Sequence, residues 1–419
     1  MSIVLQAEIL ATGDELLSGA TADTNGAWAA ARLRESGALV SRMTTVGDRL
    51  QDLCEGIRQA ADRADFVLVS GGLGPTEDDR TAEAAAAAAG LPLVRNEEAL
   101  AHTRSWFERH RLPMTANNEK QAMLPAGCDL LDNSLGTAVG FTLTLGSARL
   151  FFLPGVPHEY RRMLQDQVLP RVATEAARRG ADLPGLRILR LYGIGESRLA
   201  TELAGLDLPA GLELGYRPTW PELHLRLYFS GAGDSAAALD RAEAAIRERV
   251  GRRIYGTGER GMAATVGSLL EQRGWMLAVA ESCTGGLLGA TCTDVAGASA
   301  WFAGGCITYS NACKTALLGV PPALFESAGA VSREVAEAMA AGARERTGAA
   351  VALSATGVAG PDGGTPEKPV GLVWIGLATA DGVSAREVRL RGDRERVRLA
   401  TVWAALERAR RLLLGIAEE

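Results

Sequence analysis

Short apolar runs alternate with helix-like segments along most of this 419-residue chain, and this alternation constrains the fold more than any other feature. Residues 66–70 read Phe-Val-Leu-Val-Ser, a continuous apolar run typical of buried parallel strands. A helix is predicted before it at 50–61, and an alanine-rich helix after it at 79–89. Strand–helix alternation favours an α/β fold with a doubly wound sheet. Ligands in such folds bind at the carboxyl ends of the strands.

The alternation also predicts the domain organisation. We expect three domains, at 1–170, 171–258 and 259–419, with the Ala-, Arg- and Gly-rich stretch 171–186 as a hinge. The other predicted strands are 7–11, 39–46, 186–191, 223–228, 275–280, 303–309, 349–355, 370–379 and 385–390. The other predicted helices are 24–35, 196–203, 236–250, 262–273, 332–347 and 393–414.

Composition excludes several classes of protein. The net charge of −6 and the pI of about 5.5 disfavour non-specific or direct binding to nucleic acid. No apolar stretch of about 18 residues occurs, so no membrane span is predicted. The first residues lack the pattern of a signal peptide. The six cysteines are scattered without a zinc-binding spacing, so we expect a cytoplasmic protein with reduced thiols.

The C-terminal third contains a candidate serine nucleophile but no histidine. All four histidines lie upstream of residue 256, so Ser282 needs another base in its own domain. Lys314 is the side chain able to serve after its pKa is lowered, with Tyr309 as a possible proton relay. Two plainer interpretations remain open: Ser282 could be a helix cap, and Lys314 a solvated helix residue. Cys283 is a rival nucleophile.

Glycine-rich segments of the same domain could bind the rest of a substrate. Ser282 follows an apolar run and precedes a predicted helix, so the N–H groups of Thr284, Gly285 and Gly286 should be unpaired and able to stabilise an oxyanion. A second loop could hold a 5′-phosphate together with Arg394 or Arg396; its glycines are Gly357, Gly360, Gly363 and Gly364. Alternatively, these arginines pair with Glu395 or Glu407.

Three loops of the N-terminal domain combine glycine or proline with carboxylates. They span 12–15, 71–79 and 153–159. Glycines before a helix let N–H groups approach phosphates, and nearby carboxylates can hold a divalent cation. The candidate carboxylates are Asp14, Glu15, Asp78, Asp79 and Glu159. Each aspartate could instead cap the helix that follows it.

At these motifs the chain resembles the CinA (competence/damage-inducible protein A) family over its full length. The matching stretches in the first domain are GDELLSG at 13–19, DTN at 23–25, GGLGPTEDD at 71–79 and LPGVPHE at 153–159. The middle domain contributes YGIGES at 192–197. The last domain contributes ESCTGG at 281–286, ITYSNACK at 307–314, ATGVAGPDGG at 355–364 and TPEKPVGLVWIG at 365–376.

The resemblance implies a molybdopterin-binding-like first domain, a small KH-like α/β middle domain and an α/β amidohydrolase domain at the C-terminus. It implies that the last domain hydrolyses nicotinamide mononucleotide to nicotinate mononucleotide and ammonia, in pyridine-nucleotide salvage and without a cofactor. The family's serine, tyrosine, lysine and threonine fall on Ser282, Tyr309, Lys314 and Thr356.

For the first domain the resemblance implies a metal-dependent ADP-ribose pyrophosphatase. Asp78 and Asp79 are the expected ligands of a divalent ion, Mg or Co. The remaining expected site residues are Gly13, Asp14, Glu15, Asn25, Gly71, Gly72, Gly74, Thr76 and Glu159. We expect small nucleotides as ligands and a homodimer as the assembly.

Two other functions stay open at this point. The first domain could bind a nucleotide or pterin without catalysis, or the protein could be an accessory partner in DNA uptake or repair. The middle domain lacks a basic GXXG loop, since Gly193-Ile194-Gly195-Glu196 is acidic, and this disfavours RNA binding.

Overall fold

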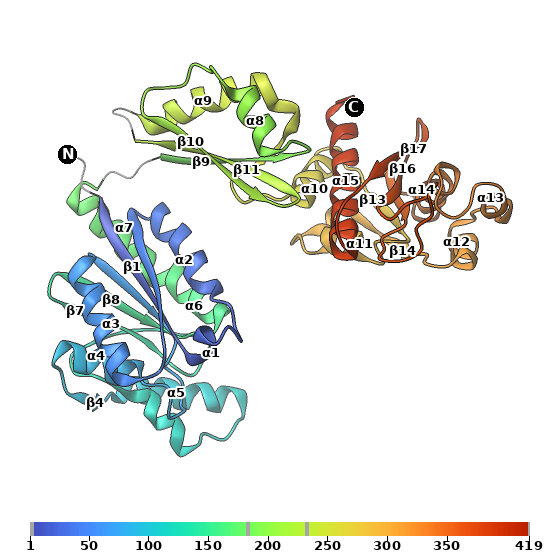
Figure 1. The fold of residues 1–419 in the computed structure, drawn as a ribbon. Helices are drawn as coiled ribbons and strands as arrows, with labels where there is room; N and C mark the ends of the chain where they lie inside the picture. The colour runs from blue at the N-terminus through green and yellow to red at the C-terminus, as the bar shows by residue number, and fades with distance from the viewer. Residues whose placement is uncertain (1–3, 182–184, 231–233, 418–419) are drawn as a thin grey trace. The chain divides into compact units, whose positions relative to one another are not determined.

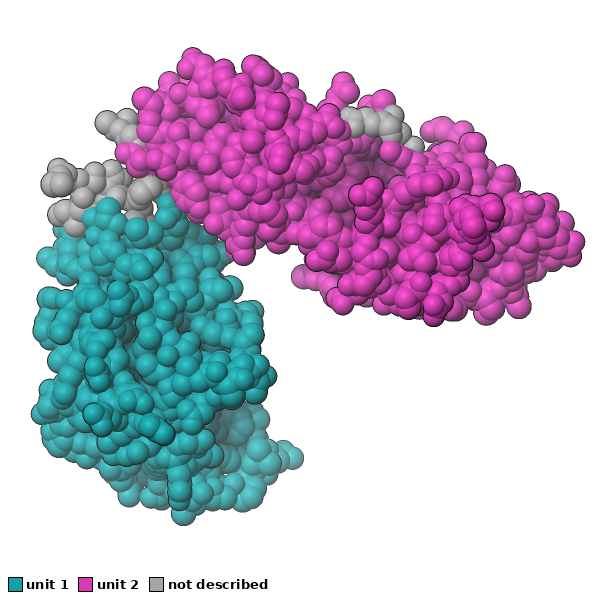
Figure 2. Space-filling model, in the orientation of Figure 1, with its two compact units in different colours: residues 1–183 teal, residues 184–419 magenta. Residues whose placement is uncertain are grey.

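The structure is a computed structural model that describes residues 4–181, 185–230 and 234–417. The chain forms two compact units, residues 1–183 and 184–419 (Figures 1 and 2). No helix within the described residues is both long and apolar enough to cross a bilayer.

A six-stranded sheet forms the centre of the first unit, in the order β2-β1-β3-β8-β7-β6 (Figure 1). Strands β2, β1, β3 and β8 run parallel, and β7 and β6 add an antiparallel edge. The strand bounds in this unit are β1 Leu5–Thr12, β2 Ala38–Val46, β3 Phe66–Ser70, β4 Leu93–Arg95, β5 Met123–Pro125, β6 Asp129–Leu131, β7 Gly140–Leu145 and β8 Ala148–Leu153. Strands β4 and β5 form a separate two-stranded ribbon.

Helices cover both faces of this sheet, as a doubly wound fold requires. One core cluster joins the sheet to α3, α4 and α5, and a second joins its other face to α2, α6 and α7. The helix bounds are α1 Asp14–Leu17, α2 Thr24–Glu35, α3 Leu50–Arg63, α4 Thr81–Ala89, α5 Glu97–His110, η1 Ala116–Ala122, α6 Pro157–Met163, η2 Leu164–Val168 and α7 Leu169–Arg179.

The expected hinge at 171–186 is wrong over most of its length. Helix α7 continues to Arg179, because Val172 and Ala176 pack into the core and alanine and arginine are strong helix formers. Residues 182–184 of that stretch lie outside the described residues.

The second unit begins with a four-stranded antiparallel sheet in the order β10-β11-β9-β12. Helices α8 and α9 pack on this sheet through a leucine-rich core. The bounds are β9 Gly185–Tyr192, α8 Glu196–Leu203, β10 Leu212–Thr219, β11 Glu222–Phe229, α9 Ser235–Val250, η3 Gly251–Arg253 and β12 Ile254–Thr257. We refer to residues 185–257 as the middle domain.

A five-stranded sheet follows, in the order β14-β13-β15-β16-β17. Strands β14, β13 and β15 are parallel, and β16 and β17 continue the sheet antiparallel. The strand bounds are β13 Leu277–Glu281, β14 Phe302–Ile307, β15 Val351–Gly357, β16 Leu372–Thr379 and β17 Gly382–Arg389. The helix bounds are α10 Met262–Glu271, α11 Leu287–Thr293, η4 Ala298–Ala300, α12 Asn311–Leu318, α13 Pro322–Ser327, α14 Arg333–Thr347 and α15 Arg394–Leu414.

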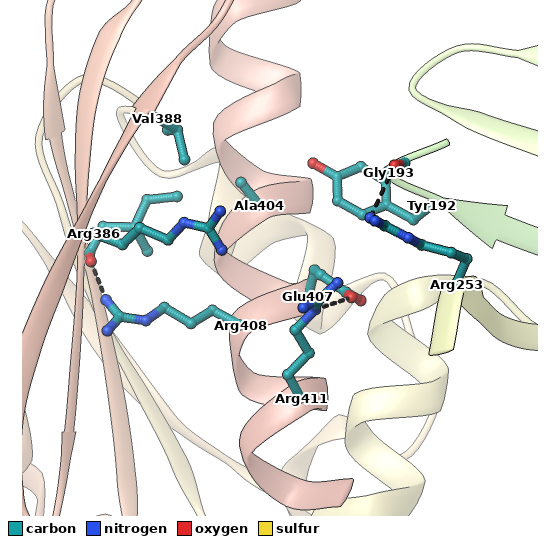
Figure 3. A pocket seen from close by; sticks show the side chains of 10 residues that line it. Tyr192, Gly193, Arg253, Arg386, Val388, Ala404, Glu407, Arg408 and Arg411 are labelled. Carbon is teal, nitrogen blue, oxygen red and sulfur yellow. Dashed lines mark hydrogen bonds and ion pairs between the residues drawn. The ribbon is translucent and has the colours of Figure 1, made fainter. Parts of the chain in front are cut away.

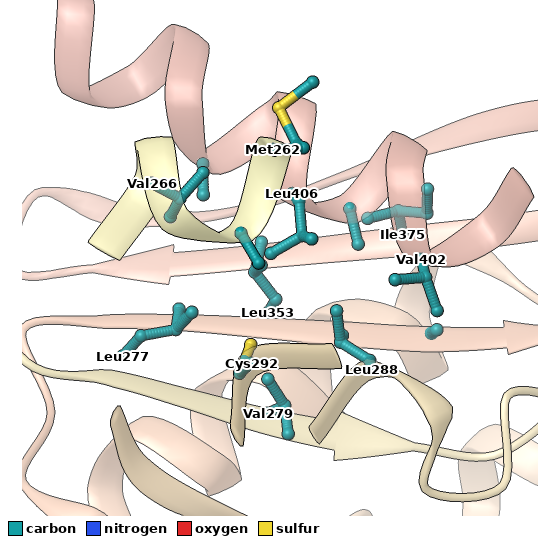
Figure 4. Close-up of a cluster of buried hydrophobic side chains, with 14 of the residues drawn as sticks. Met262, Val266, Leu277, Val279, Leu288, Cys292, Leu353, Ile375, Val402 and Leu406 are labelled. Atoms are coloured by element: carbon teal, nitrogen blue, oxygen red, sulfur yellow. The ribbon is translucent and has the colours of Figure 1, made fainter. Parts of the chain in front are cut away.

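This C-terminal sheet is also covered on both faces. Its larger core cluster packs α10, α11 and α15 against the strands, and Figure 4 shows Val266, Leu288, Leu353 and Leu406 in that cluster. The smaller cluster packs α14 and the end of α12 against the other face. Strand β13 is buried along its whole length, so whatever follows it is held by a rigid sheet.

Candidate functional site

Ser282 lies at the carboxyl end of the interior strand β13, between β14 and β15. Its backbone N–H donates to the Ala355 carbonyl of neighbouring β15 at 2.9 Å, which extends the strand pairing by one residue. Only 9% of the residue is exposed. The hydroxyl is therefore fixed at the edge of a parallel sheet where α/β proteins bind ligands.

Lys314 reaches the same point from helix α12. The Ser310 side chain caps this helix by accepting the Cys313 N–H at 3.1 Å. The Lys314 ammonium nitrogen lies 3.0 Å from Ser282 Oγ and 2.9 Å from the Thr308 carbonyl oxygen, and the residue is 1% exposed. Because Nζ contacts the serine directly, no proton relay between the two is needed.

Burial lowers the pKa of Lys314, which disfavours its charged form. The groups that oppose this effect are the thiols of Cys283 and Cys313, both weak acids. A lysine in such a place can lose its proton more readily than a surface lysine. Direct contact with a serine hydroxyl and a lowered pKa are the two properties that a general base for serine requires.

Cys283 has the opposite properties to those of a nucleophile. It is 5% exposed, and burial raises the pKa of its thiol to about 12. The reactive form of cysteine is the thiolate, which is scarce at neutral pH when the pKa is raised. The geometry therefore favours Ser282 over its neighbour.

The expected helix-start donors are mostly occupied, which corrects the sequence-based prediction. The buried Glu281 carboxylate accepts N–H groups at the start of α11, from Gly286 at 2.9 Å, Leu288 at 3.0 Å and Gly289 at 2.8 Å. The Gly285 N–H donates to the Ser282 carbonyl at 3.1 Å. A carboxylate is stabilised at a helix N-terminus, so Glu281 takes these donors. Among the described residues, the N–H groups of Cys283 and Thr284 have no backbone acceptor, and both lie beside the Cys283 sulfur.

Tyr309 and Arg394 meet the glycine-rich loop at this edge of the sheet. Tyr309 is 62% exposed, and its hydroxyl oxygen accepts a hydrogen bond from the Arg394 guanidinium at 3.1 Å. Arg394 also donates to the Gly360 carbonyl at 2.7 Å. A positive charge thus lies beside the loop after Gly357. The Thr356 hydroxyl is engaged elsewhere, since it donates to the Ala330 carbonyl at 2.7 Å.

Arg396 does not join this group. Its guanidinium lies over the Trp220 ring of the middle domain, 5.3 Å from the ring centroid. The proposed alternative pairing of these arginines with Glu407 is wrong, because that carboxylate pairs with Arg410 and Arg411.

One residue that the sequence analysis missed is Arg398. It donates to the Thr284 carbonyl from two nitrogens, at 2.7 and 3.2 Å, and so ties α15 to the turn after Ser282. The signal was available, because Arg394 and Arg398 are four residues apart and share a helix face.

The N-terminal loops line one cleft of about 680 Å³ at the carboxyl ends of β1, β3 and β8. The structure brings together most of the residues expected there. The predicted residues that line the cleft are Glu15, Asn25, Gly71, Gly72, Gly74, Asp79 and Glu159. The predicted residues outside its lining are Gly13, Asp14, Thr76 and Asp78.

Two features give this cleft its shape. Gly71 has φ +106°, and a side chain there would also meet the Thr12 carbonyl at 2.8 Å, so glycine is required. Asn25 is 6% exposed and donates to the Gly155 carbonyl at 2.8 Å, which joins α2 to the loop after β8. Within the described residues, Asn25 Oδ1 is buried without a hydrogen-bond partner.

The carboxylates in this domain do not cap helix α4. The N-cap of α4 is Arg80, because Asp79 instead accepts the N–H of Thr76 at 2.9 Å and that residue's hydroxyl. The helix accordingly begins two residues later than expected. Glu159 accepts a hydrogen bond from the Asn133 amide at 2.7 Å.

Negative charge concentrates at the neighbouring Asp48, which the sequence analysis missed. Burial raises the pKa of Asp48, and the charges of Asp14, Glu15 and Asp78 raise it further. Even so, no three His, Cys, Asp or Glu side chains gather to hold a metal ion in the part of the chain that the structure describes. The expected ion at Asp78 and Asp79 stays a prediction.

Comparison with known families divides the chain into three segments. Residues 8–174 match a family described as a probable molybdopterin binding domain. Residues 186–256 match the damage-inducible protein CinA KH domain, and residues 259–413 match the CinA C-terminal domain.

Relatives match over nearly the whole length. The chain is 45% identical to a CinA-like protein of Anaeromyxobacter sp. (strain Fw109-5), over 96% of this chain and 98% of the relative. It is 44% identical to a CinA-like protein of Citrifermentans bemidjiense, over 98% of each. The crystal structure of the competence/damage inducible protein CihA from Agrobacterium tumefaciens is 41% identical over 38% of this chain and 94% of its own, with a TM-score of 0.35.

Proposed function

Since the chain belongs to the CinA family, we propose that residues 259–419 hydrolyse the carboxamide of nicotinamide mononucleotide to nicotinate mononucleotide and ammonia. The observation that carries this proposal is the 3.0 Å contact between buried Lys314 Nζ and Ser282 Oγ. A serine next to a lysine of lowered pKa is equipped for acyl transfer without histidine.

The reaction proceeds through an acyl-enzyme. Neutral Lys314 accepts the hydroxyl proton of Ser282 as Oγ bonds to the amide carbon, which gives a tetrahedral oxyanion. The ammonium of Lys314 then returns a proton to the amide nitrogen, the C–N bond breaks and ammonia leaves. Water attacks the resulting ester with Lys314 again as base, and this step releases the carboxylate and restores Ser282.

Other residues bind and orient the substrate. The N–H groups of Cys283 and Thr284 are the donors left for the oxyanion. Arg398 acts as a positioning residue, because it holds the Thr284 carbonyl and so the turn that carries these donors. Arg394, Tyr309 and the loop at Gly360 provide a positive, hydrogen-bonding surface for the 5′-phosphate.

Ammonia release from nicotinamide mononucleotide tests this function on the full chain. Ser282→Ala should abolish it with the thermal midpoint unchanged. Ser327→Ala is the matched control, because Ser327 is an exposed serine of the same domain whose hydroxyl donates to the Ala323 carbonyl of its own helix. Full activity in Ser282→Ala would refute the assignment.

A second activity is proposed for the N-terminal cleft, metal-dependent hydrolysis of the ADP-ribose pyrophosphate. The cleft volume of about 680 Å³ and its glycine loops suit a nucleotide. The carboxylates are of the oxygen-donor type that Mg²⁺ prefers, but no three of them converge among the described residues. Mg²⁺ commonly takes one or two carboxylates and completes its shell with water and substrate phosphates. Asp78 and Asp79 would hold it, and the ion would neutralise the phosphates.

The alternative for this cleft is binding without turnover. AMP formation from ADP-ribose, measured with and without chelator, distinguishes the two. Chelator should stop AMP formation and leave ammonia release unchanged. Binding of ADP-ribose with no AMP in the presence of Mg²⁺ or Co²⁺ would instead identify a binding module.

A further inference from the structure

Trp220 brings the middle domain to the start of helix α15. It lies in the turn between strands β10 and β11. The Arg396 guanidinium lies over its ring, 5.3 Å from the ring centroid. Arg396 stands in the first turn of α15, between Arg394 and Arg398, which contact the proposed amidase site. The middle domain therefore touches the same helix start that the amidase site uses.

The geometry of an α-helix places Arg396 on the side opposite these two arginines. Arg394 and Arg398 are four residues apart and share one face, from which they donate to the carbonyls of Gly360 and Thr284. Arg396 is two residues from each, which rotates it by about 200° around the helix axis. The start of α15 is thus held on one side by the loops of the amidase site and on the other by Trp220.

The turn that carries Trp220 is itself fixed by buried hydrogen bonds. The carboxylate of Glu222, the first residue of β11, accepts hydrogen bonds from the Tyr255 hydroxyl and, at 3.5 Å, from Arg190. The Glu222 side chain is 9% exposed, so water competes little for these bonds. Strands β12 and β9 therefore fix the end of the hairpin on which Trp220 stands.

The middle domain is also attached to α15 further along the helix. Tyr192 stacks on Trp403 with ring centroids 5.6 Å apart, and Tyr255 meets the same ring edge-on at 5.5 Å. Arg410 donates to the Arg252 carbonyl at 2.7 Å. Figure 3 shows Tyr192 beside the second half of α15, where the two domains line a cavity of about 170 Å³. These contacts hold the middle domain against the helix.

From this arrangement we infer that Trp220 is a positioning residue for substrate binding at the amidase site, an inference that rests on the proposed function. Helix ends fray, and Arg394, the first residue of α15, is the proposed ligand of the 5′-phosphate. By holding Arg396 in the same turn, Trp220 keeps Arg394 in the conformation that binds phosphate. Less ordering is then needed when the substrate arrives, which strengthens binding.

Kinetics of ammonia release from nicotinamide mononucleotide test this role on the full chain. A cation–π contact at an exposed site corresponds to about two- to fivefold in an equilibrium constant. Trp220→Ala should therefore raise KM about two- to fivefold and leave kcat within about twofold, because Ser282 and Lys314 are held by other elements. Trp220→Phe should restore most of the lost affinity, since it keeps an aromatic face for Arg396.

A double-mutant cycle shows whether the contact carries the effect. Arg396→Gln should raise KM as much as Trp220→Ala does, and the double variant should rise no further, because both substitutions remove one contact. Trp275→Ala is the matched control and should keep the wild-type KM. Trp275 is 40% exposed and lies before β13, at the end of that strand opposite Ser282.

Hydrogen exchange of the segment 394–400 reports on the helix start without substrate. Exchange should be about two- to fivefold faster in Trp220→Ala and unchanged in Trp275→Ala. A wild-type KM in Trp220→Ala overturns the inference, and so do increases that multiply in the double variant. If the wild type releases no ammonia, the proposed function fails and the exchange rates alone decide the positioning role: faster exchange in Trp220→Ala supports it, and unchanged exchange overturns it.

Discussion

The lowered pKa of Lys314 predicts how amide hydrolysis depends on pH. A lysine with an ordinary pKa of about 10.4 is neutral in about one molecule of 2,500 at pH 7. Every tenfold gain in the neutral fraction corresponds to about 1.4 kcal/mol of disfavoured charge. Burial lowers the pKa of Lys314, so the rate should rise with pH and level off below the pH at which an ordinary lysine titrates.

Lys314→Met should remove this dependence. The methionine side chain has a similar length and cannot accept a proton. We expect the rate of ammonia release to fall by about 10² to 10⁴, the usual contribution of a general base. The ascending limb of the pH–rate profile should disappear with it.

The same substitution should change stability much less than activity. Lys314 donates hydrogen bonds to Ser282 Oγ and the carbonyls of Thr308 and Tyr309, and each is worth about 1 kcal/mol. Methionine loses these bonds but also removes the cost of burying an amine. We therefore expect a net change within about 2 kcal/mol.

The sign of the pH effect on stability follows from linkage. Between the lowered pKa of folded Lys314 and the ordinary value for lysine, the unfolded chain binds more protons, so wild-type stability should rise with pH. This contribution should vanish in Lys314→Met.

Ammonia release measured across a range of pH tests the rate profile. Urea unfolding at pH 7 and pH 9 tests the effect on stability. Lys368→Met is the control, because Lys368 is a partly exposed lysine that donates to the Ala328 carbonyl at 2.6 Å. The reasoning fails if Lys314→Met keeps the wild-type rate and profile, or if the control loses them equally.

Three further predictions follow from single contacts. Glu281→Gln should lower the free energy of unfolding by about 1–3 kcal/mol in urea titrations, because the buried group that accepts three N–H donors loses its charge. Unchanged stability would contradict the role of Glu281 as the anchor of this turn. Arg394→Gln should raise KM for nicotinamide mononucleotide about tenfold or more and change kcat less, with Arg389→Gln unaffected. Asp79→Asn should reduce AMP formation and spare ammonia release; a joint loss of both would argue against independent sites.

The α/β fold and most of its elements could be predicted from local sequence patterns. Strand β3 was predicted at its observed bounds, and β13 and α15 within a residue or two, because continuous apolar runs and long amphipathic segments are the strongest local signals. The strands β7 and β8 and helix α5 were not predicted. Pairing of β8 beside β3 and of β16 beside β15 depends on contacts between distant segments, which periodicity does not encode.

The candidate sites were predictable as residue types but not as contacts. The absence of histidine singled out Ser282 and Lys314, and the structure places them in hydrogen-bond contact. The partners of Asp79 and Arg396 were not foreseen, because a side chain's hydrogen bonds depend on which loop or domain it meets after folding. Arg396 meets Trp220, which is 176 residues earlier in the chain, since 396 − 220 = 176.

In the turn at 281–286, the N–H groups that bind Glu281 differ from those proposed for the oxyanion. The sequence pattern did not distinguish these two roles. A serine before a helix start and the helix-start donors suggested one oxyanion site, yet Glu281 occupies the donors from Gly286 onward. This carboxylate satisfies the helix start and anchors the turn to β13. The groups that raise the pKa of Lys314 are the two thiols and not Glu281, so the anchor does not oppose the lowering of this pKa by burial. The turn can therefore be rigid without an acid that would hold Lys314 in its charged form, and that is the condition under which a lysine can activate Ser282.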